Sequence, residues 1–527
     1  MTRPLEAIAS FNIWMEPWIT VERPGGVARC GIEHALLHAH EYIAIYDPSP
    51  LVVAGIHRLL TAVLQAALDP QRRADLRKLL AAGCFPPTQI AAFGKQFARR
   101  FDLFSPAEPF MQSADLSPYP AKGDKVKTVA YLAQDIPSGT EITHYRHGSD
   151  DACVLCPACA AAGLVMIPAF ATSGGAGIKP SINGVPPIYV LPGGTSLFES
   201  LALSLLTPDY QPRAASDKRD DTWWLRKPLV QKGKEVRDVS YLHSLTFPAR
   251  RVRLHPERLT ANCSRCGRAT EWGVRTMVFE MGESRSKDAA VWTDPFAAYR
   301  ITGNKPPTPI RPQEGKATWR EFSGLFLQDA QPATAVSKKQ VTMQRPGVLN
   351  QMADYGLAGD VRAFPFRCVG LRTDMKAKVF EWLDAGFDVP PKLLADVPSG
   401  LVVRNAIAFA TTCAGAIGTV FRSAFGGNVK NQERFAVLKS RMQDGYWSSL
   451  AEPFRQFVLA IGEPADAEST RRAWIDTVVQ QARAAFLETS EAVGDDAVAL
   501  RERVRAEVHC NNLLNKLKRV ELGGETK

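Results

Sequence analysis

The chain has 527 residues, which at roughly 100–200 residues per domain is enough for two to four domains, so a small binding module is excluded. Hydrophobic residues make up 45% of the sequence and charged residues 22%, which is typical of a soluble globular protein and excludes disordered and fibrous classes. The formal net charge of +10 favours a polyanionic partner such as nucleic acid.

The excess positive charge is concentrated in the N-terminal part of the chain. Residues 388–527 contain 18 Lys and Arg and 17 Asp and Glu, a net charge of +1, whereas residues 1–387 contain 46 basic and 37 acidic side chains, a net charge of +9. We therefore expect the N-terminal part to hold nucleic acid and the C-terminal part to face protein.

The N-terminal third is predicted to be mixed structure that begins with helices. Ser49 and Pro50 form an N-cap and first-turn pair, and apolar residues then recur at helical spacing as far as Val63, which predicts a helix with one buried face. A second helix is predicted over residues 88–103. Pro and Gly are frequent from there to Gly194, and we expect short strands and functional loops in that stretch.

The middle and the end of the chain differ in pattern. Short β-rich runs predict strands, at 247–254, 275–280 and 364–371. After Pro390 and Pro391, four long amphipathic segments predict helices joined by short turns, over 395–425, 429–462, 467–491 and 494–521. We predict an α+β fold in which a large mixed N-terminal domain (1–387) with a four-cysteine zinc site is followed by a C-terminal four-helix bundle (388–527).

No targeting or membrane segment is predicted. Glu6 and Glu16 interrupt the N-terminal stretch that a secretory signal would need to be apolar. The longest apolar run, 405–421, is shorter than the roughly 18–20 residues that a membrane span requires, and it contains Thr411 and Thr412. We expect a cytoplasmic protein with no membrane partner.

Five of the ten cysteines lie in two clusters, at positions 153, 156 and 159 and at positions 263 and 266. Two C-x-x-C pairs supply the four thiolates that tetrahedral Zn²⁺ needs, and Gly267 suits the turn of such a knuckle. Free thiols or a redox pair are the alternative, and disulfides are the weaker explanation in a cytosolic chain. The prediction is a closed structural zinc site without catalytic function, formed by Cys156, Cys159, Cys263 and Cys266, with Cys153 as a spare thiol or a substitute ligand.

Other candidate catalytic groups are weak. His34, His38 and His40 lie close in sequence to Glu33 and Glu41, but they form no H-E-x-x-H motif, and we predict a structural or surface role for them. The sequence contains no P-loop, nucleophile elbow or dinucleotide fingerprint, so nucleotide hydrolysis and acyl transfer have no visible residues. We therefore predict that the chain is not an enzyme.

A glycine-rich stretch, Ser-Gly-Gly-Ala-Gly at 173–177, is followed by Lys179. Glycines let a backbone approach a partner closely and offer N–H groups to acceptors such as phosphates or a groove edge. Considered alone, such a stretch is more often a flexible loop. The basic composition of this part of the chain favours a contact with nucleic acid.

Several landmarks occur together: Trp-Met-Glu-Pro-Trp-Ile-Thr-Val at 14–21, Glu-Pro-Phe-Met-Gln at 108–112, both C-x-x-C pairs, the glycine-rich stretch and the C-terminal helices. In this combination, the chain resembles the large subunit of the type I-E CRISPR Cascade complex over essentially its full length. The resemblance implies a non-catalytic subunit of an RNA-guided surveillance complex that recognises the protospacer-adjacent motif (PAM) in double-stranded DNA through the minor groove. It also implies roles in starting strand separation and R-loop formation and in recruiting a separate helicase–nuclease, with guide CRISPR RNA and other Cascade subunits as partners.

The resemblance also implies which residues contact nucleic acid. The PAM-reading loop corresponds to Gly174, Gly175, Ala176 and Gly177, followed by Lys179, and a basic residue that enters the same groove corresponds to Arg285 or Lys287. Tyr131 matches a guide-RNA contact whose ring stacks on a base; a tyrosine buried in a strand is the alternative.

The strand-separating wedge departs from the family pattern. The family has an Asn-Gln hairpin tip, whereas this chain has Asp374, Met375 and Lys376 there. A methionine can intercalate and unstack a base step, and Asp374 could accept a hydrogen bond from guanine N2 and so bias the recognised PAM. Two other functions remain open: a zinc-containing nucleic-acid-processing enzyme, and an architectural guide-RNA-binding scaffold.

Overall fold

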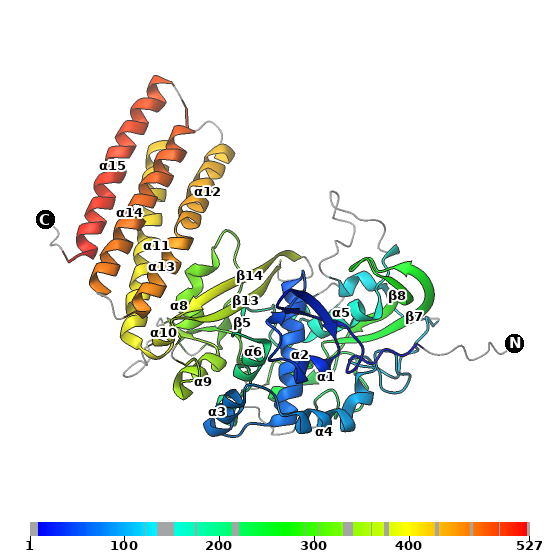
Figure 1. The fold of residues 1–527 in the computed structure, drawn as a ribbon. Coiled ribbons are helices and arrows are strands. Elements are labelled where there is room, and N and C mark those ends of the chain that lie inside the picture. Colours follow the sequence, from blue (N-terminus) through cyan, green and yellow to red (C-terminus); the bar gives the residue numbers. More distant parts are fainter. Residues whose placement is uncertain are drawn as a thin grey trace.

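The computed structural model describes residues 9–121, 123–133, 152–173, 177–212, 221–289, 291–303, 305–329, 341–359, 361–373, 379–426, 432–463, 467–494 and 496–523. A body of mixed helices and strands precedes a region of long helices that extends away from it (Figure 1). Helix and strand therefore occur in the proportions and order that the α+β prediction requires.

The body opens with a small antiparallel sheet in the order β2-β1-β3. Asp102 ties the start of this region to a later segment, because its carboxylate accepts hydrogen bonds from the Ser10 hydroxyl and the Phe11 amide. The elements are β1 (Ile19–Arg23), β2 (Gly26–Cys30), α1 (Ile32–Leu37) and β3 (Ala44–Ile45).

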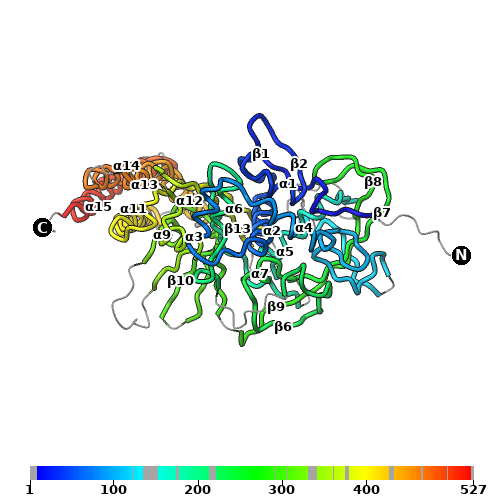
Figure 2. The backbone as a smooth tube through the Cα atoms, turned by 60° about the horizontal axis from the view of Figure 1, so that its bottom comes forward, coloured from blue at the N-terminus to red at the C-terminus, as the bar shows by residue number. Residues whose placement is uncertain are grey.

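The helix predicted after Ser49 is α2 (Pro50–Leu68), with Pro50 in its first turn. The Ser49 hydroxyl does not cap it and has no hydrogen-bond partner among the described residues. The prediction of a single buried face was wrong, because every residue from Pro50 to Gln65 is buried. The helix packs against α4 (Pro87–Phe97), α5 (Pro157–Phe170), α7 (Tyr241–Leu245) and the sheet that contains β13 (Phe364–Thr373) and β14 (Val379–Val389) (Figures 1 and 2). The second predicted helix is confirmed as α4 followed by a 3₁₀ turn, Ala98–Phe101.

Helix α5 lies in the stretch where the sequence analysis expects only short strands and loops. All its residues from Ala158 to Phe170 are buried. A helix that is apolar on every side has no polar face, so its sequence shows no helical periodicity, and this is why it escaped prediction.

The three predicted strands are confirmed, and two of them form one long hairpin. β7 (Arg250–Asn262) pairs with β8 (Ala269–Met281), and β4 (Val126–Thr128) adds to the β8 edge. The third predicted strand, β13 (Phe364–Thr373), lies between β14 (Val379–Val389) and β5 (Tyr189–Pro192) in a central antiparallel sheet (Figure 1). The remaining elements of the body are α3 (Arg73–Ala82), α6 (Leu197–Leu203), β6 (Glu235–Val236), β9 (Ser284–Arg285), β10 (Tyr299–Thr302), β11 (Thr308–Pro309), α8 (Phe322–Phe326), β12 (Val341–Gln344) and α9 (Gly347–Tyr355).

The C-terminal region is helical, but it has one long helix more than predicted within the described residues. The predicted helix 429–462 is two helices that meet at Leu450. Pro453 explains the break, because proline is tolerated in the first turn of a new helix but not in a helix interior. α11 packs against α14 and α15, and α12 packs against α14 (Figure 2). The helices are α10 (Pro391–Ala395), α11 (Val397–Phe425), α12 (Gln432–Ser449), α13 (Ala451–Gly462), α14 (Ala467–Glu491) and α15 (Ala497–Glu521).

Aromatic side chains join the helical region to the body. Trp319, in a 3₁₀ turn of the body, lies with its ring centroid 4.7 Å from Phe454 and 5.6 Å from Trp447. Its indole N–H donates to the Trp447 carbonyl at 3.3 Å. The change from mixed to helical structure falls between β14 and α10; a division into two domains at residue 388 stays a prediction.

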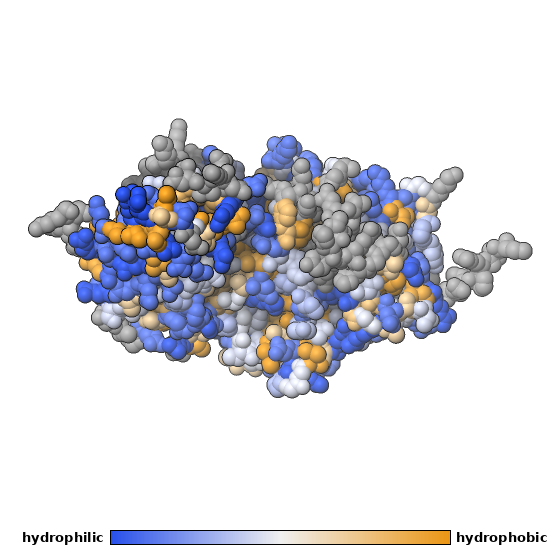
Figure 3. All heavy atoms as spheres, turned by 90° about the horizontal axis from the view of Figure 1, so that it is seen from above, coloured by the Kyte–Doolittle hydropathy of each residue, from blue (hydrophilic) through white to orange (hydrophobic). Residues whose placement is uncertain are grey.

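Two helices, α2 and α11, are long and apolar enough by length and composition to cross a membrane. The apolar window of α2 is 83% buried in the fold, as expected of a core helix, and that of α11 is 50% buried. The face shown in Figure 3 is mainly hydrophilic with separate hydrophobic patches, as is usual for a folded protein.

Candidate metal centre and nucleic-acid surface

The two C-x-x-C pairs lie together, as predicted. The sulfur atoms of Cys156, Cys159, Cys263 and Cys266 are all within 4.8 Å of one another. The Sγ atoms of Cys156 and Cys266 are 3.8 Å apart. Tetrahedral coordination with Zn–S distances of about 2.3 Å requires sulfurs roughly 3.8 Å apart, so these four residues could hold a metal ion.

Local structure positions each pair. Cys156 and Cys159 lie at the start of α5, while Cys263 and Cys266 occupy the turn between β7 and β8. In that turn Gly267 adopts a positive φ of 70°, and its N–H donates to the Cys263 carbonyl at 2.8 Å. A glycine adopts this conformation without strain, as predicted for the turn after the second C-x-x-C pair.

Hydrogen bonds among the four thiols shift their pKa values in opposite directions. The pKa of Cys266 is lowered to about 5, first by its hydrogen bond with the Cys159 thiol. The pKa of Cys263 is also lowered, by hydrogen bonds from Cys156 and Cys159. Cys153 is buried nearby but does not belong to this group of four. The pKa values of Cys156 and Cys159 are raised, first by their hydrogen bonds with the neighbouring thiols and also by burial, so the cluster holds two thiols that favour the thiolate form and two that favour the protonated form. Four converging sulfurs are a donor set that could hold a metal ion and would fill a tetrahedral site.

The end of the glycine-rich stretch is described from Gly177 onward, whereas Gly174, Gly175 and Ala176 lie outside the described residues. Gly177 has a φ of 81°, which favours glycine. The Lys179 ammonium pairs with Glu235 on β6, with the two atoms 2.6 Å apart. The predicted loop therefore ends beside β6.

The second basic candidate lies next to the same strand. β6 pairs in parallel with β9, which contains Arg285. Lys287 is exposed, while Arg285 is half-buried. Burial lowers the pKa of Arg285. The hydrogen bond with Lys179 lowers the pKa of Glu235, and the positive charges of Lys179 and Lys287 lower it further. Lys179 and Lys287, far apart in the sequence, are thus brought to one surface around Glu235.

A buried polar network behind this surface was missed by sequence reasoning. Asp294 accepts hydrogen bonds from both terminal nitrogens of Arg58, at 3.2 and 2.8 Å, and from the Asn183 amide at 2.9 Å. The Trp292 indole N–H donates to the Asn183 side-chain oxygen at 3.0 Å. Asn183 follows the glycine-rich stretch and Trp292 follows Lys287, so the network joins the two candidate loops. These are isolated polar residues without a motif, and no sequence signal marked them.

Tyr131 is an exposed residue of a 3₁₀ turn, Val129–Leu132, with 48% of its surface accessible. The alternative of a tyrosine buried in a strand was therefore wrong. Its ring centroid lies 5.8 Å from that of Phe279 and 5.8 Å from the Lys127 ammonium nitrogen. An exposed ring beside a cation suits stacking on a base.

The predicted wedge lies at the tip of the β13–β14 hairpin. The last strand pair before the tip is Thr373 opposite Val379, while Asp374, Met375 and Lys376 lie outside the described residues. Next to this last pair, an ion pair joins the two strands: Arg372 Nε donates to Glu381 at 2.8 Å.

Two other features do not belong to these sites. The His34 and His38 rings stack with centroids 4.2 Å apart, and their Nδ1 atoms contact Tyr42 and Glu41, so these histidines are held by ordinary side-chain contacts.

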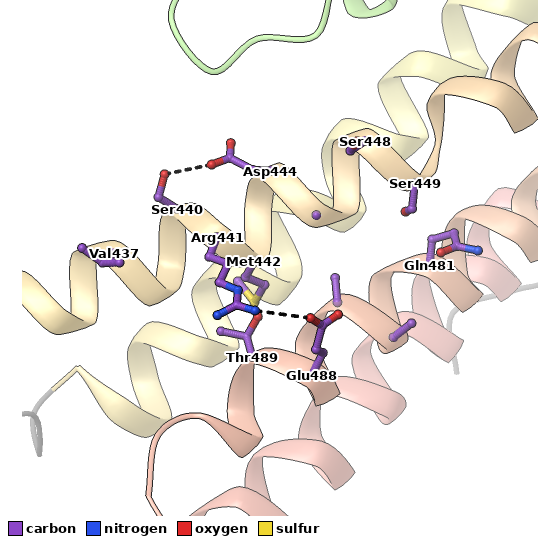
Figure 4. Close-up of a pocket in the computed structure, with 13 residues that line it drawn as sticks. Val437, Ser440, Arg441, Met442, Asp444, Ser448, Ser449, Gln481, Glu488 and Thr489 are labelled. Atoms are coloured by element: carbon purple, nitrogen blue, oxygen red, sulfur yellow. Dashed lines mark hydrogen bonds and ion pairs between the residues drawn. The ribbon is translucent and has the colours of Figure 1, made fainter. Parts of the chain in front are cut away.

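A groove of about 690 Å³ runs between α12 and α14, where Arg441 and Glu488 approach to 3.8 Å (Figure 4).

Comparisons with known proteins place the chain in one family. Residues 12–485 match the model of the CRISPR-associated protein Cse1 family. A CRISPR-associated protein CasA/Cse1 from Thermus thermophilus is 28% identical, over 97% of this chain and 98% of the relative. The crystal structure of Cse1 from Acidimicrobium ferrooxidans has a TM-score of 0.78 at 23% identity, over 98% of this chain and 99% of that one. A chain of a solved CRISPR RNA-guided surveillance complex has a TM-score of 0.71 at 19% identity, over 95% of this chain and 99% of that one. At this identity the match shows a similar fold.

Proposed function

Because the chain belongs to the CRISPR-associated Cse1 family, that of the type I-E Cascade large subunit, we propose that it is a non-catalytic subunit of a surveillance complex that recognises the PAM in double-stranded DNA. In such complexes guide pairing supplies most sequence specificity, and protein needs to read only a short duplex motif. We expect it to act in the cytoplasm with guide CRISPR RNA and other Cascade subunits.

The observation that carries this proposal is the meeting of two basic loops. Lys179 and Lys287 lie around Glu235 at the end of the glycine-rich stretch. The minor groove is only about 6 Å wide, so a loop of small residues enters it more easily than bulky side chains do. In our proposal Gly174, Gly175, Ala176 and Gly177 face the groove, and Lys287, the exposed candidate, enters it in preference to Arg285.

Strand separation is assigned to the tip of the β13–β14 hairpin. Met375 is proposed to intercalate beside the PAM, Asp374 to accept from guanine N2, and Lys376 to contact phosphate. The Arg372–Glu381 ion pair supports this role, because it joins β13 to β14 next to the point where the wedge segment begins. Tyr131 is proposed to stack on a base of the guide RNA.

The four clustered cysteines are proposed to hold a structural Zn²⁺. The bound ion would join the start of α5 to the turn between β7 and β8 and would neutralise the thiolates. Cys156, Cys159, Cys263 and Cys266 occupy every position of a tetrahedral site, so no catalytic function is assigned to it. The helical region, whose part of the chain carries a net charge of only +1, is proposed to face other subunits, and the complex to recruit a separate helicase–nuclease.

The test is reconstitution of the chain with guide RNA and its neighbouring subunits, followed by binding to duplexes that carry a library of PAM sequences. We expect Lys287→Ala to weaken binding to PAM-containing duplexes by at least about tenfold, or about 1.4 kcal/mol. Arg275→Ala, which removes a partly exposed cation of β8 that pairs with Glu257 away from β6, is the control and should change binding much less.

Each alternative function has its own outcome in this test. Nuclease activity of the isolated chain would support a processing enzyme, and PAM-independent binding would support a guide-RNA scaffold.

Asp374→Ala should change PAM preference; an unchanged preference would remove the proposed contact with guanine. Met375→Ala should reduce R-loop formation more than initial duplex binding, and equal losses would contradict the wedge.

A further inference from the structure

One buried arginine connects the two ends of the glycine-rich stretch. Arg250, the first residue of β7, is 4% exposed. One terminal guanidinium nitrogen donates to the Lys179 carbonyl at 2.8 Å, and the other donates to the Thr172 carbonyl. Thr172 immediately precedes the stretch 173–177 and Lys179 follows it. A single side chain therefore bridges the stem of this loop.

The Arg250 guanidinium interacts mainly with backbone carbonyls, and its central carbon also lies 5.9 Å from the centroid of the Phe279 ring. Within the part of the chain that the structure describes, no carboxylate pairs with Arg250, and burial lowers its pKa to about 10. A buried guanidinium is costly unless its donors are satisfied, and here the acceptors are the backbone carbonyls of Thr172, Lys179 and Ala249. The planar fork of arginine holds two carbonyls at a fixed separation, whereas the rotatable donors of a lysine ammonium impose no such geometry.

Neighbouring contacts hold both partners of this bridge in place. The Ser181 N–H donates to the Ala171 carbonyl at 2.9 Å, which closes the stem one step further from the loop. The backbone at Arg250 packs closely against Gly282. A Cβ atom added to Gly282 would lie 2.7 Å from the Arg250 backbone nitrogen, which leaves no room for a side chain there. The loop stem and the arginine are thus fixed to β7 and β8.

We propose that Arg250 is a positioning residue for PAM recognition: by bridging the Thr172 and Lys179 carbonyls, it fixes the two ends from which the glycine-rich loop is presented to the minor groove. This inference rests on the proposed function of the loop. Without the bridge, the loop must lose conformational freedom on binding DNA, and the entropy of that ordering weakens affinity.

The test compares two arginines of the same strand in the reconstituted complex. Arg250→Lys keeps the charge but replaces the two separate terminal nitrogens of the planar fork with a single ammonium nitrogen. The control is Arg253→Lys: Arg253 is also buried on β7, its pKa is likewise lowered to about 10, and it donates to the distant Ser105 carbonyl at 3.3 Å. We expect Arg250→Lys to reduce affinity for a PAM-containing duplex at least about tenfold, or about 1.4 kcal/mol.

The readout that a merely structural role would not change is the ratio of affinities for the PAM-containing duplex and for single-stranded DNA complementary to the guide. Arg250→Lys should lower this ratio, while Arg253→Lys should leave it unchanged even where both lower the melting temperature. Arg250→Gln, which removes the charge and the bridge, should lower the ratio as well and serves if the lysine variant does not fold. Equal ratios for the variants at 250 and 253 would overturn the inference.

The same experiment separates this inference from the proposed function. Gly177→Val and Lys287→Ala alter the loop and the basic residue themselves. If both leave the ratio unchanged, the proposed function is wrong. If both lower it while the Arg250 variants match Arg253→Lys, the loop reads the PAM and only the positioning role fails.

Discussion

Replacing Asp294 with asparagine tests the buried polar network behind the basic surface. The Arg58 side chain is 2% exposed and that of Asp294 is 0% exposed. Burial alone would lower the pKa of Arg58, but the adjacent carboxylate of Asp294 raises it above its ordinary value. Asp294→Asn preserves the shape of the side chain, removes the negative charge and can turn an N–H group toward the guanidinium.

The expected loss is large because one charge stays buried without its partner. Removing one member of a buried ion pair typically costs about 3–5 kcal/mol. The Asp294 carboxylate also accepts from the Asn183 amide and from the Phe296 backbone N–H, so these donors lose a charged acceptor as well. We expect Asp294→Asn to lower the free energy of unfolding of the body by about 3–5 kcal/mol.

Urea unfolding followed by tryptophan fluorescence measures this loss, because Trp292 contacts the network through Asn183. The matched control is Asp384→Asn, which breaks an equally well aligned pair at the surface, where Arg367 donates to both carboxylate oxygens at 2.8 Å. Exposed pairs contribute about 0.2–1 kcal/mol. If Asp294→Asn costs no more than Asp384→Asn, burial does not set the strength of the network and the reasoning is wrong.

Three further predictions concern the metal centre, the basic surface and buried histidines. Cys263→Ala should abolish binding of one zinc per chain and lower the melting temperature, whereas Cys153→Ala should retain the metal. Mass spectrometry measures the zinc content of both variants. If both variants retain zinc, the four-cysteine site is wrong. Glu235→Gln releases Lys179 and reduces the negative charge near Lys287. It should therefore strengthen binding to duplexes of any sequence and make this binding depend more steeply on salt concentration. Unchanged binding in a salt titration would contradict a surface shared by the two lysines. Burial lowers the pKa of His243 to about 3. Below about pH 6.5 the unfolded chain therefore takes up a proton on this histidine that the folded chain does not. The free energy of unfolding should fall by about 2 kcal/mol between pH 7 and pH 5. His243→Leu should reduce that fall in urea unfolding at the two pH values, and an equally steep fall would show that His243 does not contribute.

The sequence by itself determined those features that depend on local pattern or on residue type. Apolar and β-rich runs predicted β7, β8 and β13, and amphipathic segments predicted the C-terminal helices. The two C-x-x-C pairs predicted the cysteine cluster, because four thiols in two tight turns have few other uses. The order of the motifs also indicated the family, which the comparisons confirm.

Only the tertiary structure decided which distant residues meet. Helix α5 is apolar on all sides, so its burial could not be read from periodicity, and the break at Leu450 depends on where the second helix can restart around Pro453. Arg250 and Asp294 carry no motif, because a hydrogen bond to a backbone carbonyl or a buried ion pair leaves no pattern in the sequence around it. Their positions follow from long-range packing, which brings Thr172, Lys179 and the loop before Trp292 to one surface.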